Sequence, residues 1–260
     1  MLTGKTAIVT GSTSGIGLAI ANALAAKGCN LVVNSFSDRT EDHAVAARIG
    51  ETHGVEAVYV KADMARPDEC RGLIEQTVAR FGGVDILINN AGIQFVAPVE
   101  EFPPERWDAI IAINLSSAFH TSAAAIPHMN VAGWGRIVNI ASAHGLRASP
   151  NKSAYIAAKH GVVGLTKAIA IEQAGKGGTR NAVCPGFVLT PLVETQIEDR
   201  MKETGLDRET TISDLILAKQ PSKQFATVEE IAAATAFLCS DEAAQITGTT
   251  LSIDGGWTAQ

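Results

Sequence analysis

The chain has 260 residues, 46% of them hydrophobic, which is enough to build one sizeable core in a single α/β domain. The formal net charge is −6 and no basic cluster is present, so the composition excludes the electrostatic footprint of a nucleic-acid-binding protein or a basic membrane patch. The N-terminus carries no basic segment before its short apolar run, and no run approaches the length that spans a bilayer. We therefore expect a cytoplasmic protein without signal peptide or membrane anchor.

Short apolar segments alternate with helical patterns along the chain, with no repeat or linker between them. Strands are expected at Thr6–Thr10, Leu31–Asn34, Ala57–Val60, Ile86–Ile88, Arg136–Ile140, Arg180–Val183 and Thr249–Ile253. Helices are expected at Ile16–Lys27, Asp38–His53, Pro67–Phe81, Pro104–Met129 (one helix or two), Ser153–Gly175 and Val228–Leu238. This alternation predicts a parallel sheet covered on both faces, in one doubly wound Rossmann-type α/β domain over residues 1–260.

One segment breaks the alternation. Thr190–Phe225 is a charged insertion with two helical patterns, placed between a strand and the next core helix. A long insertion at the carboxyl edge of a parallel sheet is typical of a substrate lid, and a surface excursion without function is the alternative.

Four cysteines are spread widely, at Cys29, Cys70, Cys184 and Cys239. They lack the close spacing that metal sites and redox motifs use. This pattern favours buried, reduced thiols in a reducing compartment, and no metal site is expected.

Tyr155 and Lys159 are four residues apart, which places both side chains on one face of a helix. A nearby ammonium lowers the pKa of a phenol from about 10 toward working pH, so the pair is a candidate acid/base device. Ser142, upstream, offers a hydroxyl for a substrate oxygen. Taken alone, such a pair is equally typical of an ordinary helix surface.

A glycine cluster, Gly11, Gly15 and Gly17, follows the first expected strand and opens the first helix. Glycines at this position let the backbone approach a pyrophosphate, and the free N–H groups of the helix start face the anion. The spacing is GxxxGxG, and the strand-before, helix-after context indicates a dinucleotide site.

These motifs, together with Asn89-Asn90-Ala91-Gly92, Asn114 and Pro185-Gly186, resemble the short-chain dehydrogenase/reductase family in order and spacing over essentially the whole chain. The resemblance implies a seven-stranded parallel Rossmann sheet, an NAD or NADP cofactor and a homotetramer. The helices Pro104–Met129 and Ser153–Gly175 are then the expected interface.

The resemblance also assigns a catalytic set, Asn114, Ser142, Tyr155 and Lys159. Tyr155 is then the general base for the alcohol proton, Lys159 lowers its pKa, and Ser142 positions the reacting oxygen. Asn114 is expected to hold a water that passes the proton to bulk solvent; a core asparagine that kinks its helix is the alternative.

The expected cofactor residues follow from the same resemblance. Asp63 would accept a hydrogen bond from the adenine amine, although a turn carboxylate is the alternative. The full set is Gly11, Thr13, Gly15, Ile16, Gly17, Phe36, Asp63, Asn90, Gly92, Tyr155, Lys159 and Thr190.

Neither the glycine loop nor the end of the second strand, at Asn34-Ser35-Phe36, carries a cation for a 2′-phosphate. Arg39 comes too late to be a first choice, and the acidic residue usual for NAD is also missing from the strand end. We favour NAD, with Phe36 shaping the adenosine pocket.

Substrate choice is expected in polar residues around Tyr155 that supply a cation, amides and an imidazole to one carboxylate. Several sequence runs resemble a bacterial subgroup of the family that interconverts (R)-3-hydroxybutyrate and acetoacetate, the chemistry of ketone-body metabolism. The carboxylate-binding set of that subgroup matches Gln94, His144, Lys152 and Gln196. Phe187 and Trp257 would wall the apolar side of a pocket for a short chain. The expected substrate residues are Gln94, Ser142, His144, Lys152, Tyr155, Phe187, Gln196 and Trp257.

Two positions depart from the subgroup: Phe187 replaces a frequent tryptophan, and Arg180 replaces a small residue. A reductase of another short 3-oxo acid, or an NADPH-dependent reductase of 3-oxoacyl thioesters, is the alternative enzyme. A thioester has no free carboxylate, which argues against the second. A non-enzymatic dinucleotide sensor is a further alternative, although such proteins usually lose the tyrosine or the lysine.

Overall fold

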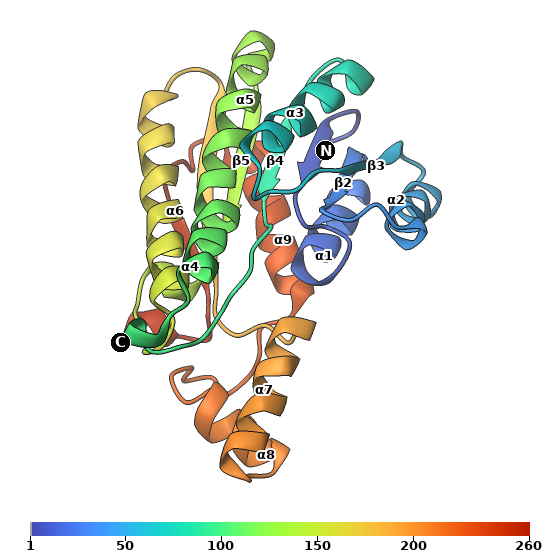
Figure 1. Ribbon diagram of the computed structural model, residues 1–260. Coiled ribbons are helices and arrows are strands. Elements are labelled where there is room, and N and C mark those ends of the chain that lie inside the picture. Colours follow the sequence, from blue (N-terminus) through green and yellow to red (C-terminus); the bar gives the residue numbers. More distant parts are fainter. Residues whose placement is uncertain (1) are drawn as a thin grey trace.

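The computed structural model describes residues 2–260. One parallel sheet of seven strands has the order β3-β2-β1-β4-β5-β6-β7, which confirms the predicted doubly wound fold (Figure 1). The direction of strand addition reverses between β1 and β4, and this reversal opens a crevice at the carboxyl edge of the sheet. The strands are β1 Thr6–Val9, β2 Asn30–Ser35, β3 Ala57–Lys61, β4 Ile86–Asn89, β5 Gly135–Ile140, β6 Gly178–Pro185 and β7 Thr250–Ile253.

Helices cover both faces of the sheet. One apolar core joins α1, α2 and α9 to one face, and a second core joins α3 and α5 to the other, where α4 and α6 also lie (Figure 1). The buried central strands are nearly continuous apolar runs, as a sheet covered on both sides requires. The helices are α1 Gly15–Ala25, α2 Thr40–His53, α3 Pro67–Phe81, α4 Pro104–Ile111, α5 Ser117–Ala132, α6 Ser153–Glu172, α7 Pro191–Thr204, α8 Arg208–Thr210 and α9 Val228–Leu238.

The expected long helix from residue 104 is interrupted but continuous in direction. A π-helical turn, Ala112–Ser116, joins α4 to α5, so the helical stretch runs over 104–132. By length and composition alone this stretch would cross a membrane, contrary to the sequence expectation. Its contacts with α3, β4 and β5 make it a core helix of the domain.

The insertion predicted at 190–225 folds as α7, α8 and a second π-helical turn, Thr211–Ile216, beyond the carboxyl edge of the sheet (lower part of Figure 1). It has a small apolar core of its own, which includes Ile197 and Leu217 and packs against Phe187. The backbone N–H of Ala226 donates to the Phe187 carbonyl (2.9 Å) and closes the base of the insertion. The segment is therefore a compact cover, which we call the lid.

All four cysteines are buried and free, as expected. The unusual Arg180 also is buried: its side chain is 1% exposed, and its guanidinium turns back over Gly178 on the same strand. None of its three side-chain nitrogens has a hydrogen-bond partner among the described residues. Burial lowers the pKa of Arg180, and neighbouring Arg136 lowers it further. An unpaired buried cation of this kind costs stability.

We predict that Arg180→Met stabilises the protein, because methionine fills a similar volume without a buried unpaired charge. The free energy of unfolding should rise by about 1–3 kcal/mol in urea titrations at fixed protein concentration. Arg136→Met is the matched control, since its guanidinium lies over the Trp134 ring (4.2 Å) and bonds the Gly135 carbonyl (3.0 Å). The control should destabilise; a destabilised Arg180→Met would contradict the prediction.

Candidate active site

A cavity of about 530 Å³ lies at the carboxyl edge of the sheet, between the glycine loop and the lid. Its wall contains every residue that the sequence assigned to catalysis, cofactor or substrate. Residues with no sequence assignment also line it, among them Ser14, Asn34, Arg39, Met64 and Val193. The fold thus brings residues from position 11 to position 257 to one place.

The glycine loop has the backbone shape of an anion cradle. Gly11 and Gly15 have left-handed φ angles of 61° and 54°, which other residues adopt only with strain. A Cβ on Gly17 would lie 2.3 Å from the Gly11 carbonyl oxygen, so only glycine fits there. Ser14 caps α1 without a side-chain bond, and the first turn carries no acidic residue, so the helix N–H groups face the cavity without an internal acceptor.

Asparagine side chains hold this loop in place. Asn90 Nδ2 donates to the carbonyls of Thr10 (2.9 Å) and Gly11 (3.0 Å). The Thr10 hydroxyl accepts from the backbone N–H of Asn90 and of Ala91, both at 3.0 Å. Asn90, expected to line the adenosine, therefore also ties the end of β1 to the end of β4.

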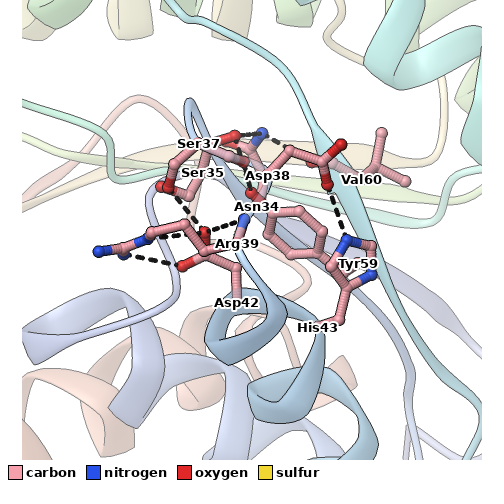
Figure 2. Close-up of polar contacts among 9 residues, drawn as sticks. All are labelled: Asn34, Ser35, Ser37, Asp38, Arg39, Asp42, His43, Tyr59 and Val60. Carbon is pink, nitrogen blue, oxygen red and sulfur yellow. Dashed lines mark hydrogen bonds and ion pairs between the residues drawn. The ribbon is translucent and has the colours of Figure 1, made fainter.

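The far end of the cavity, after β2, is a polar network (Figure 2). The Asp42 carboxylate, on the first turn of α2 and 2% exposed, accepts from Ser37 (2.7 Å) and from Arg39 Nη2 (3.0 Å) and Nε (3.3 Å). The bonds from Arg39 and Ser37 lower the pKa of Asp42 to about 2. The Tyr59 hydroxyl donates to the backbone carbonyl of Ser37, so the whole turn is fastened to β3.

Two candidate residues lie at this end. Arg39 lines the cavity, although its place in the chain made it a poor first choice as a cation for a 2′-phosphate. Two of its three guanidinium nitrogens, Nε and Nη2, donate to Asp42. Asp63 also lines the cavity, and its carboxylate accepts from the Ala65 N–H (2.9 Å), as a turn carboxylate does.

The acid/base group lies at the centre of the cavity. Ser142 Oγ accepts from the backbone N–H of His144 (3.1 Å), which leaves the hydroxyl hydrogen for the Tyr155 oxygen or a ligand. Lys159, buried to 4% exposure, donates to the Ile140 carbonyl (2.8 Å) and lies 5.6 Å from the Tyr155 ring centroid.

The expected lowering of the Tyr155 pKa is wrong for the protein without cofactor or substrate. Burial raises the pKa of Tyr155, and only the bond with Ser142 opposes this. Burial also lowers the pKa of Lys159 to about 8. Desolvation of both groups therefore outweighs the effect expected from their spacing on α6.

Asn114 lies in the π-helical turn, a feature that often marks functional sites in long helices. Its Nδ2 donates to the carbonyls of Ile93 (2.9 Å) and Ile110 (3.0 Å), which fixes the amide. Its Oδ1 is buried and has no partner among the described residues. A fixed, unsatisfied acceptor beside the cavity suits a bound water, as expected for a proton exit.

The lid end of the cavity is cationic and aromatic. Lys152 Nζ donates to Gln196 Oε1 on the lid (3.5 Å) and lies 5.7 Å from the Phe187 ring centroid. Phe187 stacks on Trp257 with centroids 5.5 Å apart and planes 3° from parallel. Burial lowers the pKa of Lys152 to about 8, with smaller contributions from Arg200 and Lys219. An ammonium in this setting is well placed to bind a carboxylate next to an apolar wall.

The sheet order, the glycine cradle and the Tyr155–Lys159 pair that lines the cavity together define a nicotinamide-dependent oxidoreductase. A family model described as enoyl-(acyl carrier protein) reductase matches residues 11–258. The chain belongs to the short-chain dehydrogenase/reductase family. In the part of the chain that the structure describes, no group of histidine, cysteine and acidic side chains is arranged to hold a metal ion.

Three relatives match nearly end to end. A D-beta-hydroxybutyrate dehydrogenase of Rhizobium meliloti is 55% identical over 256 residues, covering 98% of this chain and 99% of its own length. A D-beta-hydroxybutyrate dehydrogenase of Cupriavidus necator is 55% identical over 260 residues and covers both chains fully. A 3-oxoacyl-[acyl-carrier-protein] reductase of Staphylococcus epidermidis is 36% identical over 252 residues, covering 97% of this chain and 98% of its own.

We predict that binding of a small carboxylate, with acetate as the probe, weakens above pH 8. The ammonium of Lys152 loses its proton as the pH rises through its lowered pKa of about 8, and the attraction for the anion is lost with it. The inhibition constant of acetate should rise by up to about tenfold per pH unit above that value. Lys152→Arg keeps its charge and should remove the rise; a constant value in the wild type from pH 7 to 10 would contradict the assignment.

Proposed function

We propose that the protein interconverts (R)-3-hydroxybutyrate and acetoacetate by hydride transfer to or from NAD. The observation that carries the proposal is the convergence of Lys152, Gln196 and His144 at one end of the cavity that holds Tyr155 and Ser142. A carboxylate bound at Lys152 leaves a short carbon chain to reach the tyrosine. The relatives at 55% identity, named for this substrate, support the same assignment.

The residues present fit a dinucleotide. The glycine cradle suits the pyrophosphate, since Gly17 lets the start of α1 lie close against the loop backbone at Gly11, and the turn after β2 suits the adenosine ribose. Lys159 and Thr190 would meet the nicotinamide end. When bound, NAD supplies the hydride acceptor and a positively charged ring close to Tyr155. That charge is the expected counterweight to the burial that raises the pKa of Tyr155.

In the oxidative direction Tyr155 removes the hydroxyl proton of the substrate. Ser142 donates a hydrogen bond to the same oxygen and holds it beside the tyrosine, while Lys152 fixes the other end of the molecule. The unsatisfied Oδ1 of Asn114 would hold a water through which the proton leaves. Phe187 and Trp257 exclude bulk water from the apolar side. In the reductive direction Tyr155 returns the proton.

NAD is favoured over NADP by the charge balance at the ribose end. NADP adds a phosphate dianion, and the nearest cation, Arg39, is already neutralised by Asp42 (Figure 2). The exposed Phe36 adds no charge. A 2′-phosphate would therefore lie beside a buried carboxylate without a free cation from this turn.

We extend the proposal to a cytoplasmic homotetramer. The free, buried cysteines suit a reducing compartment. Large apolar side chains are exposed on the helices expected at the interface, with Phe119 and Val131 on α5 and Ile171 on α6. Such exposure is typical of a protein contact surface. The molar mass in solution, measured by light scattering, tests this assembly.

We predict that 3-hydroxybutyrate with NAD gives a far higher kcat/KM than acetoacetyl thioester with NADPH, because a thioester leaves Lys152 without its anion. Steady-state assays of 3-hydroxybutyrate with NAD or NADP, and of acetoacetyl thioester with NADH or NADPH, make the comparison, and a preference for the thioester would overturn the proposal. Tyr155→Phe is the control: NAD binding should persist while kcat falls by about 10²- to 10⁴-fold.

We predict that Asp42→Asn shifts the cofactor preference toward NADP. The amide leaves Arg39 free to pair with a 2′-phosphate, which should raise kcat/KM for NADP by about tenfold. The double variant Asp42→Asn, Arg39→Gln should lose the gain. A gain that survives in the double variant, or an unchanged preference in the single one, would show that this ion pair does not set the choice.

A further inference from the structure

A second cavity of about 490 Å³ adjoins the first, beyond the end formed by Lys152 and Gln196, where the substrate carboxylate is proposed to bind. The two cavities share the walls formed by His144, Lys152, Phe187, Gln196 and Trp257. The remaining walls come from the lid, from the loop that precedes α6 and from Val96–Pro98 after β4. That loop and the lid meet behind His144, at Ser149 and Lys219, neither of which lines the inner cavity.

A chain of three side chains runs from the lid to the substrate site. Lys219 Nζ donates to Ser149 Oγ (3.3 Å) and to the Ala148 carbonyl (3.4 Å). Ser149 Oγ is 3.0 Å from Nε2 of His144. The His144 ring packs edge-on against Trp257, at 4.8 Å between centroids, and against Tyr155, at 5.9 Å. The imidazole therefore has little freedom to turn.

His144 is neutral across the working range of pH. Burial, with the positive charges of Lys152 and Lys219, lowers its pKa to about 3. A neutral imidazole carries one N–H, and its other nitrogen bears a lone pair. Which nitrogen holds the hydrogen decides whether His144 attracts or repels an anion in the inner cavity, because only the N–H can donate to a carboxylate.

The hydrogen-bond inventory favours one tautomer. A lysine ammonium can only donate, so it occupies a lone pair of Ser149 Oγ. The serine hydroxyl hydrogen is then available for donation to His144 Nε2, 3.0 Å away. The positive charge of Lys219 also favours a lone pair, rather than an N–H, on the side of the ring that faces it. Both effects favour the hydrogen on Nδ1.

We propose that Ser149 and Lys219 are positioning residues, which hold His144 in the tautomer with Nδ1 protonated so that it donates to the substrate carboxylate. The inference rests on the proposed carboxylate site. Lys219 closes the lid, and its backbone carbonyl accepts from the side chain of the C-terminal Gln260 (3.1 Å). The donor state of His144 is thereby tied to the seating of the lid on the loop before α6.

The direct test is ¹⁵N NMR of the histidine side chains, with the His144 signals assigned by their loss in His144→Gln. We expect a protonated Nδ1 and an unprotonated Nε2 in the wild type. In Ser149→Ala the hydrogen should redistribute toward Nε2. An Nε2–H tautomer in the wild type, or an unchanged tautomer in Ser149→Ala, would overturn the proposal.

Kinetics supply the second readout. Ser149→Ala and Lys219→Met should raise the KM for 3-hydroxybutyrate and the inhibition constant of acetate by roughly 5- to 20-fold, with kcat much less affected. Ser149→Thr keeps the hydroxyl and should restore most of the binding. Lys202→Met removes another lid cation outside both cavities and should leave KM unchanged. If Lys202→Met and Lys219→Met raised KM equally, the effect would come from the overall charge of the lid, which would contradict the proposal.

The NMR result separates this inference from the proposed function. The tautomer of His144 is read without substrate, so an Nε2–H form refutes the positioning role even in an active dehydrogenase. Conversely, a wild-type protein that does not oxidise 3-hydroxybutyrate yet shows the Nδ1–H form would refute the proposed substrate. The positioning role of Ser149 and Lys219 would still stand.

Discussion

The site depends on the bond network that joins the ends of β1 and β4. Asn90 Nδ2 spans the carbonyls of Thr10 and Gly11, while the Thr10 hydroxyl receives two backbone N–H groups in return. These strands are neighbours only because the sheet changes its direction of growth between them. The network holds the glycine cradle at the mouth of that crevice. The cavity lies between this junction and the lid.

The pKa values of the titratable groups in the cavity are set by burial more than by the four-residue spacing of Tyr155 and Lys159 on α6. Lys159 and Lys152 are both held near a pKa of about 8, and Tyr155 is shifted upward, because each has been removed from water. Such groups are sensitive to whatever charge arrives next to them. Under the proposed function, a carboxylate beside Lys152 and a positive nicotinamide ring beside Tyr155 would each favour the charged form of the neighbouring group.

At each end of the cavity, a polar side chain that lines it has hydrogen-bonding positions taken up by a neighbouring residue. Asp42 occupies the guanidinium of Arg39 at the ribose end. Ser149, itself held by Lys219, occupies one nitrogen of His144 at the lid end. Under the two proposals, the neighbour rather than the residue that lines the cavity sets the choice of cofactor at one end and of substrate at the other.

The sequence by itself determined the strand–helix alternation, the glycine cradle and the identity of the residues around the cavity. The alternation and the cradle follow from local rules, namely apolar periodicity, helix ends at glycines such as Gly54 and Gly82, and motif spacing, while the cavity residues follow from the resemblance to the family. Only the tertiary structure decided the pairing of Arg39 with Asp42, the π-helical turn at Asn114, the upward shift of the Tyr155 pKa and the contact of Lys219 with Ser149. The Tyr155 shift depends on desolvation and the Lys219–Ser149 contact on packing between distant segments, whereas the Arg39–Asp42 pair and the π-helical turn depend on local backbone geometry that residue spacing does not specify.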